Sequence, residues 1–452
     1  MIKFSLLLAA FLIIAPSIVP RNKRMTIDKE KYAQIVKAEF LHAWDAYKKY
    51  AWGHDELKPV SKSGFDWYGS SFYMTPVDAF DTMLLMGLKD EAAETKELIL
   101  NNLNFDQDVF VQNFEITIRF LGGLLSAFEF DGDKRFLTLA EDLGKRLLPA
   151  FNSKTGMPYV NVNLKTGETR NEVNNPAEIG TLMLEFGTLS RLTGNSIYYD
   201  KAKNAVQQDY KRRSKIGLVG TTINVNTGEW QDTESHISGM IDSYYEYLLK
   251  SWLLLGDNDF KVMYDSSIAA VNHFLPDTVD NRLWYGKVDM NTGQRTNTTF
   301  GALDAFLPAV LSLGRDLKRA EDLQESCFFM WKHFGIEPEE FNYKTMQVAY
   351  PQYVLRPENM ESAYYLYHFT KNDKYLKMGE VYLKSIMDKC RLDEGYTSLQ
   401  NVSTREKGDK MPSFFLAETL KYLYLLFSDE NVLDFNSVIF NTEAHPLKIV
   451  FR

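Results

Sequence analysis

The chain has 452 residues, of which 45% are hydrophobic and 14% aromatic, so a large buried core is feasible and extensive disorder is excluded. Its net charge is −9 and its longest basic cluster is residues 21–24, which argues against nucleic acid as a partner. An acidic, aromatic-rich chain favours a neutral, hydroxyl-rich ligand, because aromatic faces cover sugar rings and carboxylates bind hydroxyls.

The N-terminus has the pattern of a secretory signal peptide. Lys3 precedes an apolar run from residue 4 to about residue 14, and the small residues Ala15 and Ser17 follow. The alternative is an uncleaved membrane anchor, since basic residues come next. The run is short for a membrane span and is interrupted by Pro16 and Pro20. We therefore expect a signal peptide at residues 1–20 and a secreted or periplasmic protein without a stable membrane span.

A weak internal repeat follows. A Gly/Asn/Asp turn and then an amphipathic helix recur near residues 130, 193, 255, 313 and 370, and another helix precedes most copies. The spacing of about 60 residues fits two helices with their connections, so six or seven helix pairs are expected. The connections that precede the first helix of each pair are long and irregular. This pattern predicts an all-α fold, an α/α toroid with functional loops at one end, formed by a single domain over residues 27–452.

Carboxylates recur at the starts of the predicted inner helices, each followed by apolar and aromatic residues. A single acid of this kind is usually a helix-capping residue. Six recurrences in apolar surroundings instead favour a ring of acids around a solvent-filled cavity, a cation, or both. The six segments contain Asp78 and Asp81, Glu115, Glu178 and Glu185, Asp242 and Glu246, Glu358 and Glu361, and Glu418.

Two carboxyl groups across a cavity are the requirement of glycoside hydrolysis. One stays protonated and donates to the leaving oxygen, while the other is ionised and activates water or attacks. The surplus acids suit sugar hydroxyls or an oxygen-liganded cation such as Ca²⁺. The seven histidines are scattered, which argues against zinc, and neither a P-loop nor a dinucleotide-binding glycine motif occurs.

Eight segments in order resemble glycoside hydrolase family 47, the class I α-1,2-mannosidases and the ER-degradation-enhancing mannosidase-like proteins. The resemblance extends from about Tyr50 to Val450, nearly the whole mature chain. The matching segments are "YAWGHDELKPVS", "VDAFDTMLLMGL", "FEITIRFLGGLLSA", "LEFGTLSRLTGN", "DSYYEYLLK", "LRPENMES", "FFLAETLKYLYLLF" and "FNTEAHPL".

The resemblance implies an (αα)₇ barrel with a C-terminal β-hairpin plug and Ca²⁺-dependent, exo-acting, inverting hydrolysis of terminal α-1,2-linked mannose. The implied partners are α-1,2-linked mannose oligosaccharides, and we expect a monomer. By resemblance Glu115 matches the general acid, Asp242 a second candidate for that acid, and Glu358 the general base.

The remaining site residues are also implied by the resemblance. Thr442 matches the residue that binds Ca²⁺ directly, Phe414 the aromatic residue beneath the sugar, and Glu339 is a less certain match to another pocket acid. The implied substrate-binding residues are Arg119, Glu185, Glu246, Arg356, Glu361, Phe414, Glu418 and Glu443. The tail that holds Thr442 alternates like a strand, and we expect it to enter the barrel as the plug.

The chain departs from the family at three positions. Cys327 matches one half of the family's disulfide, but the other half is Ala305, so that bond cannot form. Cys327 could instead form a disulfide with Cys390, or the two could be isolated buried thiols, and the sequence leaves both alternatives open. The missing bond suggests folding outside the eukaryotic ER, as in a bacterial periplasm. Met240 replaces an Arg that selects the trimmed branch in some members, and Ala302 aligns with a frequent His.

Two other functions are compatible with these residues. A non-catalytic mannose-binding module, as among the ER-degradation relatives, would retain the acids only for binding. An α/α-toroid enzyme that acts on another glycan is the third hypothesis, and the "NTEAHP" segment, which includes Thr442 and Glu443, argues against it.

Overall fold

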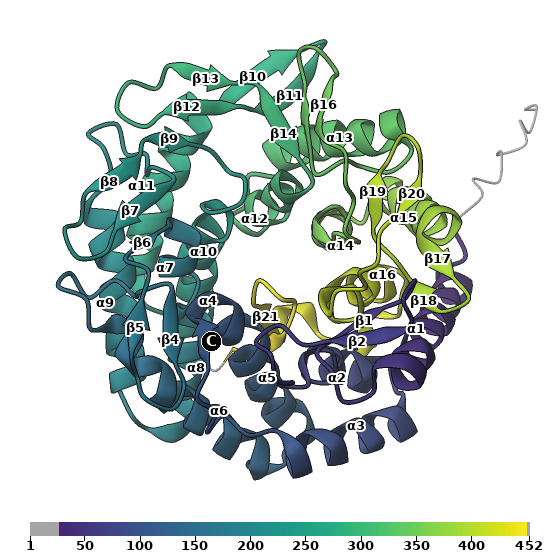
Figure 1. The fold of residues 1–452 in the computed structure, drawn as a ribbon. Coiled ribbons are helices and arrows are strands. Elements are labelled where there is room, and N and C mark those ends of the chain that lie inside the picture. Colours follow the sequence, from purple (N-terminus) through teal and green to yellow (C-terminus); the bar gives the residue numbers. More distant parts are fainter. Residues whose placement is uncertain (1–26, 450–452) are drawn as a thin grey trace, which may run out of the picture.

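The computed structural model describes residues 27–449, and its helices form a closed ring (Figure 1). The signal peptide expected at residues 1–20 lies outside the described residues, as do the last three residues of the chain. Within residues 27–449, seven inner helical segments line the ring and seven outer helices pack against them. The predicted (αα)₇ barrel is therefore confirmed.

The ring closes because consecutive inner segments pack side by side and α2 contacts η4, while the first helix, α1, covers the last, α16. The inner segments are α2 (Met74–Met86), α4 (Asn113–Ile116) with η1 (Thr117–Leu121) and α5 (Gly122–Asp131), α7 (Pro176–Gly180) with α8 (Met183–Thr193), α10 (Asp242–Leu255), η3 (Leu303–Phe306) with α12 (Leu307–Leu313), α14 (Glu358–Thr370), and η4 (Phe415–Thr419) with α16 (Leu420–Phe427). The outer helices are α1 (Lys29–Ala51), α3 (Lys89–Asn102), α6 (Lys134–Leu147), α9 (Ile197–Lys211), α11 (Asn258–Phe274), α13 (Leu317–Phe334) and α15 (Lys374–Cys390).

The two layers differ in how their sequences distribute apolar residues. Inner helix α2 is buried on nearly every side, as expected of a helix that is apolar all round. Outer helix α6 buries one face only, through Phe136, Ala140, Leu143 and Leu147, which recur at three- and four-residue spacing. The hydrophobic period thus decides which helix of each pair faces the interior.

Glycine followed by aspartate turns the chain from an inner to an outer helix. Gly132 ends α5 with φ +86° and Gly256 ends α10 with φ +72°, both in the left-handed region that favours glycine. Asp133 and Asp257 then cap the next helices, each accepting a backbone N–H. These turns are the repeated sequence feature that predicted the helix pairs.

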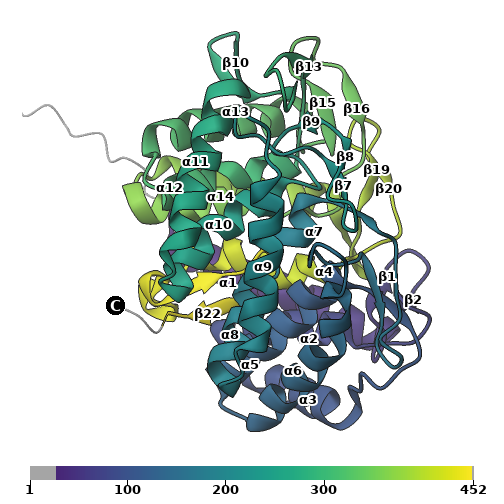
Figure 2. The same cartoon turned by 90° about the vertical axis from the view of Figure 1, so that its left-hand side faces the viewer.

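The long connections at the other end form short antiparallel strands rather than the irregular loops expected from the sequence. Figure 2 shows these sheets gathered on one end of the barrel. The strands are β1 (Glu56–Lys58), β2 (Ser63–Phe65), β3 (Phe110–Gln112), β4 (Asn161–Asn163), β5 (Thr169–Arg170), β6 (Val173–Asn174), β7 (Thr222–Asn224), β8 (Trp230–Asp232), β9 (Glu234–Ser235), β10 (Pro276–Val279), β11 (Arg282–Tyr285), β12 (Lys287–Asp289), β13 (Arg295–Asn297), β14 (Thr299–Gly301), β15 (Glu340–Asn342), β16 (Val348–Tyr350), β17 (Arg391–Leu392), β18 (Gly395–Tyr396), β19 (Leu399–Asn401) and β20 (Glu406–Lys407).

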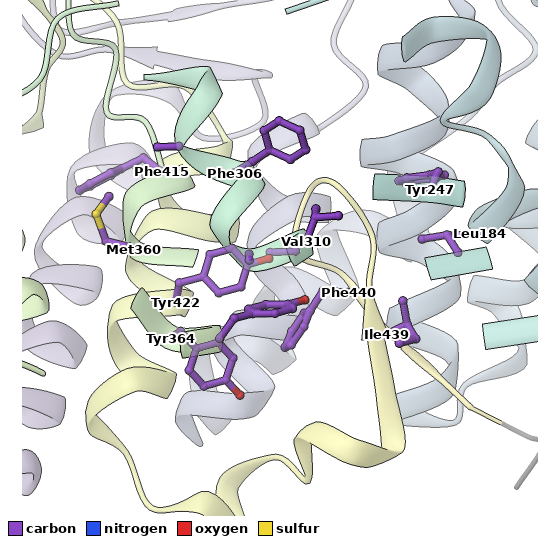
Figure 3. Close-up of a cluster of buried hydrophobic side chains, with 14 of the residues drawn as sticks. Leu184, Tyr247, Phe306, Val310, Met360, Tyr364, Phe415, Tyr422, Ile439 and Phe440 are labelled. Atoms are coloured by element: carbon purple, nitrogen blue, oxygen red, sulfur yellow. The ribbon is translucent and has the colours of Figure 1, made fainter. Parts of the chain in front are cut away.

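The C-terminal hairpin enters the ring from the opposite end, as the sequence predicted (Figures 1 and 2). Strands β21 (Val438–Phe440) and β22 (Pro446–Lys448) pair antiparallel, with Phe440 opposite Pro446. Figure 3 shows Ile439 and Phe440 among apolar side chains of the inner helices, and the Phe440 ring centre lies 5.7 Å from that of Tyr422. The hairpin therefore fills the barrel interior instead of fraying as chain ends usually do.

Two adjacent glycines let the hairpin approach α5. A Cβ at Gly122 would lie 2.5 Å from the Asn441 amide nitrogen, and one at Gly123 would lie 2.9 Å from Val77 and 3.2 Å from His445. Larger residues would therefore collide with the plug or with the neighbouring helix. The "GG" of the segment "FLGGLL" is explained by this close packing.

Both cysteines, Cys327 and Cys390, are buried and unpaired. Of the two alternatives left open by the sequence, the structure has isolated thiols. Burial raises the pKa of the Cys390 thiol to about 12, so it stays protonated at physiological pH.

Removal of residues 437–452 should destabilise the barrel as well as remove part of the cavity wall. Burying each large apolar side chain contributes roughly 1.5–3 kcal/mol, and the hairpin buries several of them. We expect a clear fall in the melting temperature by calorimetry and increased binding of a hydrophobic dye. A chain lacking only residues 450–452 is the control, and an unchanged melting temperature after the longer truncation would contradict the packing described here.

Candidate active site

A cavity of about 260 Å³ lies between the N-terminal ends of inner helices and the tip of the plug. This volume lies just below the ~300–1,000 Å³ typical of pockets for drug-sized ligands, and suits a single sugar ring. Eleven of the twelve site residues expected from the sequence line it: Glu115, Arg119, Asp242, Glu246, Arg356, Glu358, Glu361, Phe414, Glu418, Thr442 and Glu443.

The helix starts explain why these acids converge. Asp242 is the first residue of α10 and Glu358 the first residue of α14, while Glu115 lies in the first turn of α4. Successive inner helices are neighbours in the ring, so residues at equivalent positions meet around its axis. Arg119 and Glu418 lie on the π-helical turns η1 and η4, a rare geometry that is frequent at functional sites.

Arg119 joins one side of the cavity to the plug. Its Nε donates to Glu115 Oε2 at 2.9 Å, and its Nη1 donates to Glu443 Oε2 at 2.7 Å. The guanidinium is buried beside these carboxylates, and their charges hold its pKa well above the ordinary value although burial opposes this. Arg119 is therefore a permanent positive charge between α4 and the hairpin.

Arg356 is a second arginine that lines the cavity, and it pairs with an acid outside the plug. It forms a fork with Glu339, with Nε at 3.1 Å from Oε1 and Nη2 at 2.8 Å from Oε2. Glu339 itself does not line the cavity, so the structure places this less certain match behind the arginine. Both guanidinium groups, of Arg119 and Arg356, lie 5.8 Å from the centre of the Phe414 ring, which forms an apolar face between two cations.

Asp242 and Glu358 are carboxyls whose pKa values are strongly raised. Burial raises the pKa of Asp242 to about 7, and the nearby charge of Glu246 adds to the rise. Burial also raises the pKa of Glu358 to about 8, against the opposing charge of Arg356. One oxygen of Glu358 is buried and has no hydrogen-bond partner among the described residues.

A buried lysine lies under two further cavity acids. Lys250 forms a short ion pair with Glu246 and lies 3.7 Å from Glu361, and its ammonium is almost fully buried. Its charge lowers the pKa of Glu361, but burial and Glu246 outweigh it and raise that pKa to about 7. The i,i+4 pair on α10 was not recognised from the sequence, although "DSYYEYLLK" places Lys250 on the same helix face as Asp242 and Glu246.

Glu185 is the predicted site residue that the structure does not place on the cavity. It is fully buried two turns farther along the inner segment, and burial raises its pKa to about 7. Glu178, in the same sequence segment, lines the cavity instead and accepts hydrogen bonds from Gln112 at 2.9 Å and Asn175 at 3.1 Å. Glu178 lies in the first turn of α7, which Asn175 caps, whereas Glu185 lies in the first turn of α8 farther along the same inner segment.

The departures from the family pattern also have defined places. Met240 lines the cavity, is 44% exposed and has φ +78°, an uncommon conformation for a residue other than glycine. Ala302 is fully buried and does not line the cavity. Leu303 and Phe306 from η3 complete the apolar part of the wall. Contacts to a ligand on this side are therefore apolar.

The charge in the cavity suits a hard cation. Eight carboxyls line the cavity against two arginines, and Glu418 has its pKa raised well above the ordinary value by burial and then by the charge of Glu443. Over residues 27–449, however, no three His, Cys, Asp or Glu side chains are grouped as a metal centre. A cation here would use the oxygens of half-buried Thr442 at the plug's tip together with water or ligand oxygens.

The model of the family described as glycosyl hydrolase family 47 matches residues 39–449. The chain belongs to this family. It is 40% identical to an endoplasmic reticulum mannosyl-oligosaccharide 1,2-alpha-mannosidase of Mus musculus, over 93% of this chain and 68% of that protein. It is 37% identical to alpha-mannosidase I MNS5 of Arabidopsis thaliana, over 95% of this chain and 79% of that protein.

Among solved structures, an alpha-1,2-mannosidase from Trichoderma reesei superposes with a TM-score of 0.86 at 30% identity, covering 93% of this chain and 99% of that one. Membership of the family makes the chain a glycoside hydrolase. The suggestion of a bacterial source is not supported, because these relatives come from a mammal, a plant and a fungus. No helix within residues 27–449 is long and apolar enough to cross a membrane.

Replacing Lys250 by Met should destabilise the protein most strongly at high pH. Removing one partner of a buried ion pair costs about 3–5 kcal/mol, because the other charges are left uncompensated. Without the lysine, the pKa of Glu361, which burial already raises to about 7, would rise still further in the folded state. Stability would then fall as the pH rises through those values.

Thermal unfolding of Lys250→Met at pH 5 and pH 8 checks this expectation. We expect a larger loss at pH 8, where the unfolded state would ionise these acids. Lys203→Met is the matched control, since Lys203 pairs with Asp257 near the surface and should have a small effect. An equal loss at both pH values would contradict the proposed charge balance.

Proposed function

We propose that the chain is an exo-acting, inverting, Ca²⁺-dependent α-1,2-mannosidase that removes terminal α-1,2-linked mannose from high-mannose glycans or mannobiose. The observation that supports this most directly is the convergence of Glu115, Asp242 and Glu358 on one small cavity with a cation-flanked aromatic face. Two relatives named for the same activity support the substrate class. We further propose that residues 27–452 are a single catalytic domain, monomeric in the secretory pathway, after a signal peptide at residues 1–20.

The base in this proposal is Glu358. It takes a proton from a water molecule, whose oxygen attacks the anomeric carbon as the glycosidic C–O bond breaks. A general base must be ionised, but burial raises the pKa of Glu358 to about 8 although the charge of Arg356 opposes the rise. Further positive charge near Glu358 is therefore needed to keep this carboxyl ionised at neutral pH. When bound near Thr442, Ca²⁺ supplies positive charge that holds sugar hydroxyls and the attacking water.

The proton for the leaving oxygen comes from Asp242 or Glu115. The raised pKa of Asp242, about 7, favours a carboxyl that keeps its proton near neutral pH, whereas Glu115 is bonded to Arg119. No lysine or arginine among the described residues forms an ion pair with Asp242. These observations favour Asp242 as the acid, with Phe414 beneath the sugar ring.

Hydrolysis of α-1,2-mannobiose followed by NMR tests the reaction directly. We expect the first-formed mannose to have the inverted, β, configuration, no activity after EDTA treatment, and recovery when Ca²⁺ is added. Glu358→Gln should lower kcat by roughly 10²–10⁴-fold while leaving the melting temperature within a few degrees. Retention of configuration, or full activity without metal, would contradict the proposal.

Glu178 should bind substrate, and Glu185 should not. Because Glu178 lines the cavity and is aligned by Gln112 and Asn175, we expect Glu178→Gln to raise KM for mannobiose about tenfold. Glu185→Gln retains a hydrogen-bond acceptor beneath the cavity and is the matched control, with KM within about threefold of wild type. Steady-state kinetics of both variants checks this assignment, and a larger rise in KM for Glu185→Gln than for Glu178→Gln would contradict it.

The alternative is a mannose-binding protein without turnover. Met240 in the cavity wall and Ala302 at the position of a frequent family His are the observations that favour it. Calorimetry would then show tight binding of mannobiose by a protein that releases no mannose. The three candidate catalytic acids argue for hydrolysis, since a binding site has no need of a carboxyl kept protonated and another kept free of partners.

A further inference from the structure

The tip of the plug is held from below by a fully buried carboxylate, Glu185. Its Oε1 accepts hydrogen bonds from Asn441 Nδ2 at 2.8 Å and from the Tyr247 hydroxyl at 2.6 Å. Both donors contact the turn that presents Thr442: Asn441 is the preceding residue, and the Tyr247 oxygen accepts the Thr442 backbone N–H at 3.3 Å. One carboxylate of α8 thus connects α10 with the turn.

Asn441 organises the turn itself. Its Nδ2 also donates to the carbonyl of Ile118 at 2.9 Å, and its Oδ1 accepts the backbone N–H groups of Glu443 at 3.0 Å and His445 at 2.8 Å. All of its side-chain hydrogen-bonding capacity is therefore used inside the barrel. Any rotation of this amide would release two backbone groups on either side of Ala444.

The turn needs such support because its backbone is strained. Ala444 has φ +58°, a left-handed conformation that costs a residue other than glycine energy unless its surroundings enforce it. Lys421 donates to the Ala444 carbonyl at 2.7 Å and pairs with Asp81 at 2.7 Å, and Asp81 also bonds His445 at 2.7 Å. These contacts fix the far side of the turn, and Glu185 fixes the side of Thr442.

We propose that Glu185 is a positioning residue, which sets the place of the Thr442 oxygens through Asn441 and Tyr247 without touching the ligand. The inference rests on the proposed cation site at Thr442 only for its functional consequence. The hydrogen bonds that join Glu185 to the turn are made by protein groups alone and need no cation. The role requires an acceptor at Oε1 and no negative charge, which separates it from a role in substrate binding.

Four variants separate these roles. Glu185→Leu removes the acceptor and leaves both donors unpaired, whereas Glu185→Gln keeps an oxygen in the same place. Tyr247→Phe removes two hydrogen bonds, the one donated to Glu185 and the one accepted from the Thr442 backbone N–H, with little change of shape, and it serves if the leucine variant does not fold. Asp209→Leu is the matched control, because Asp209 is also a fully buried acid but lies on outer helix α9 and has no hydrogen-bond partner among the described residues.

Amide hydrogen exchange of residues 441–445 in the metal-free proteins is the first measurement. We expect exchange at least about tenfold faster in Glu185→Leu and about threefold faster in Tyr247→Phe, with Glu185→Gln and Asp209→Leu within twofold of wild type. The second measurement is the Ca²⁺ dissociation constant by calorimetry, expected to rise about tenfold or more in Glu185→Leu and to stay within threefold in Glu185→Gln.

Wild-type exchange and wild-type Ca²⁺ affinity in a folded Glu185→Leu protein would overturn the inference. Equal damage by Glu185→Gln and Glu185→Leu would also overturn it, because the charge and not the acceptor would then matter. If the wild-type protein binds no Ca²⁺, the proposed metal dependence fails, and the exchange data alone decide whether Glu185 positions the turn.

Discussion

The crowding of eight carboxyl groups with two arginines in one cavity is the constraint on which the other features of this structure depend. Mutual repulsion and burial raise the pKa values of several of these acids, to about 7 for Asp242 and about 8 for Glu358, so bare carboxylates could not share the space at low cost. Fixed positive charges of Arg119 and Lys250 offset part of this repulsion. The positive ends of the helix dipoles also stabilise the carboxylates, since several acids lie in first helical turns. The remaining imbalance gives a physical reason for a cation.

The fold can be understood as the means of bringing these acids together. Seven inner helices start at the same end of the ring, so residues close to their N-termini converge without any long-range sequence signal. The C-terminal hairpin then closes the cavity from the opposite side and contributes Thr442 and Glu443. Its position depends on two glycines of α5, on Lys421 and on Glu185, none of which needs to reach the ligand. A chain terminus with so many specific contacts is part of the site.

Much of this architecture could be predicted from the sequence, and the exceptions have physical causes. Helix pairs followed from the hydrophobic period and the Gly-Asp turns, and a ring of acids from carboxylates at helix starts within apolar surroundings. The roles expected for Glu115, Asp242 and Glu358 came from the family resemblance. Glu185 matches a family segment but lies two turns below the cavity. The helix-start pattern could not separate it from Glu178, because each lies in the first turn of a helix of the same inner segment. Lys250 lies four residues after Glu246, but the sequence does not show that both are buried beside the cavity. The short strands of the connections were missed because two- or three-residue strands depend on tertiary contacts that leave little local pattern.

A crystal structure of the protein with Ca²⁺ and a mannose-like inhibitor would show whether the plug's tip completes a cation-dependent sugar site. We predict anomalous density bonded to Thr442 oxygens, the inhibitor ring over Phe414, and carboxyls of Asp242 and Glu358 on opposite sides of the anomeric carbon, about 6.5–9.5 Å apart. Inhibitor bound with no cation at Thr442, or a cation held elsewhere by carboxylates alone, would contradict it.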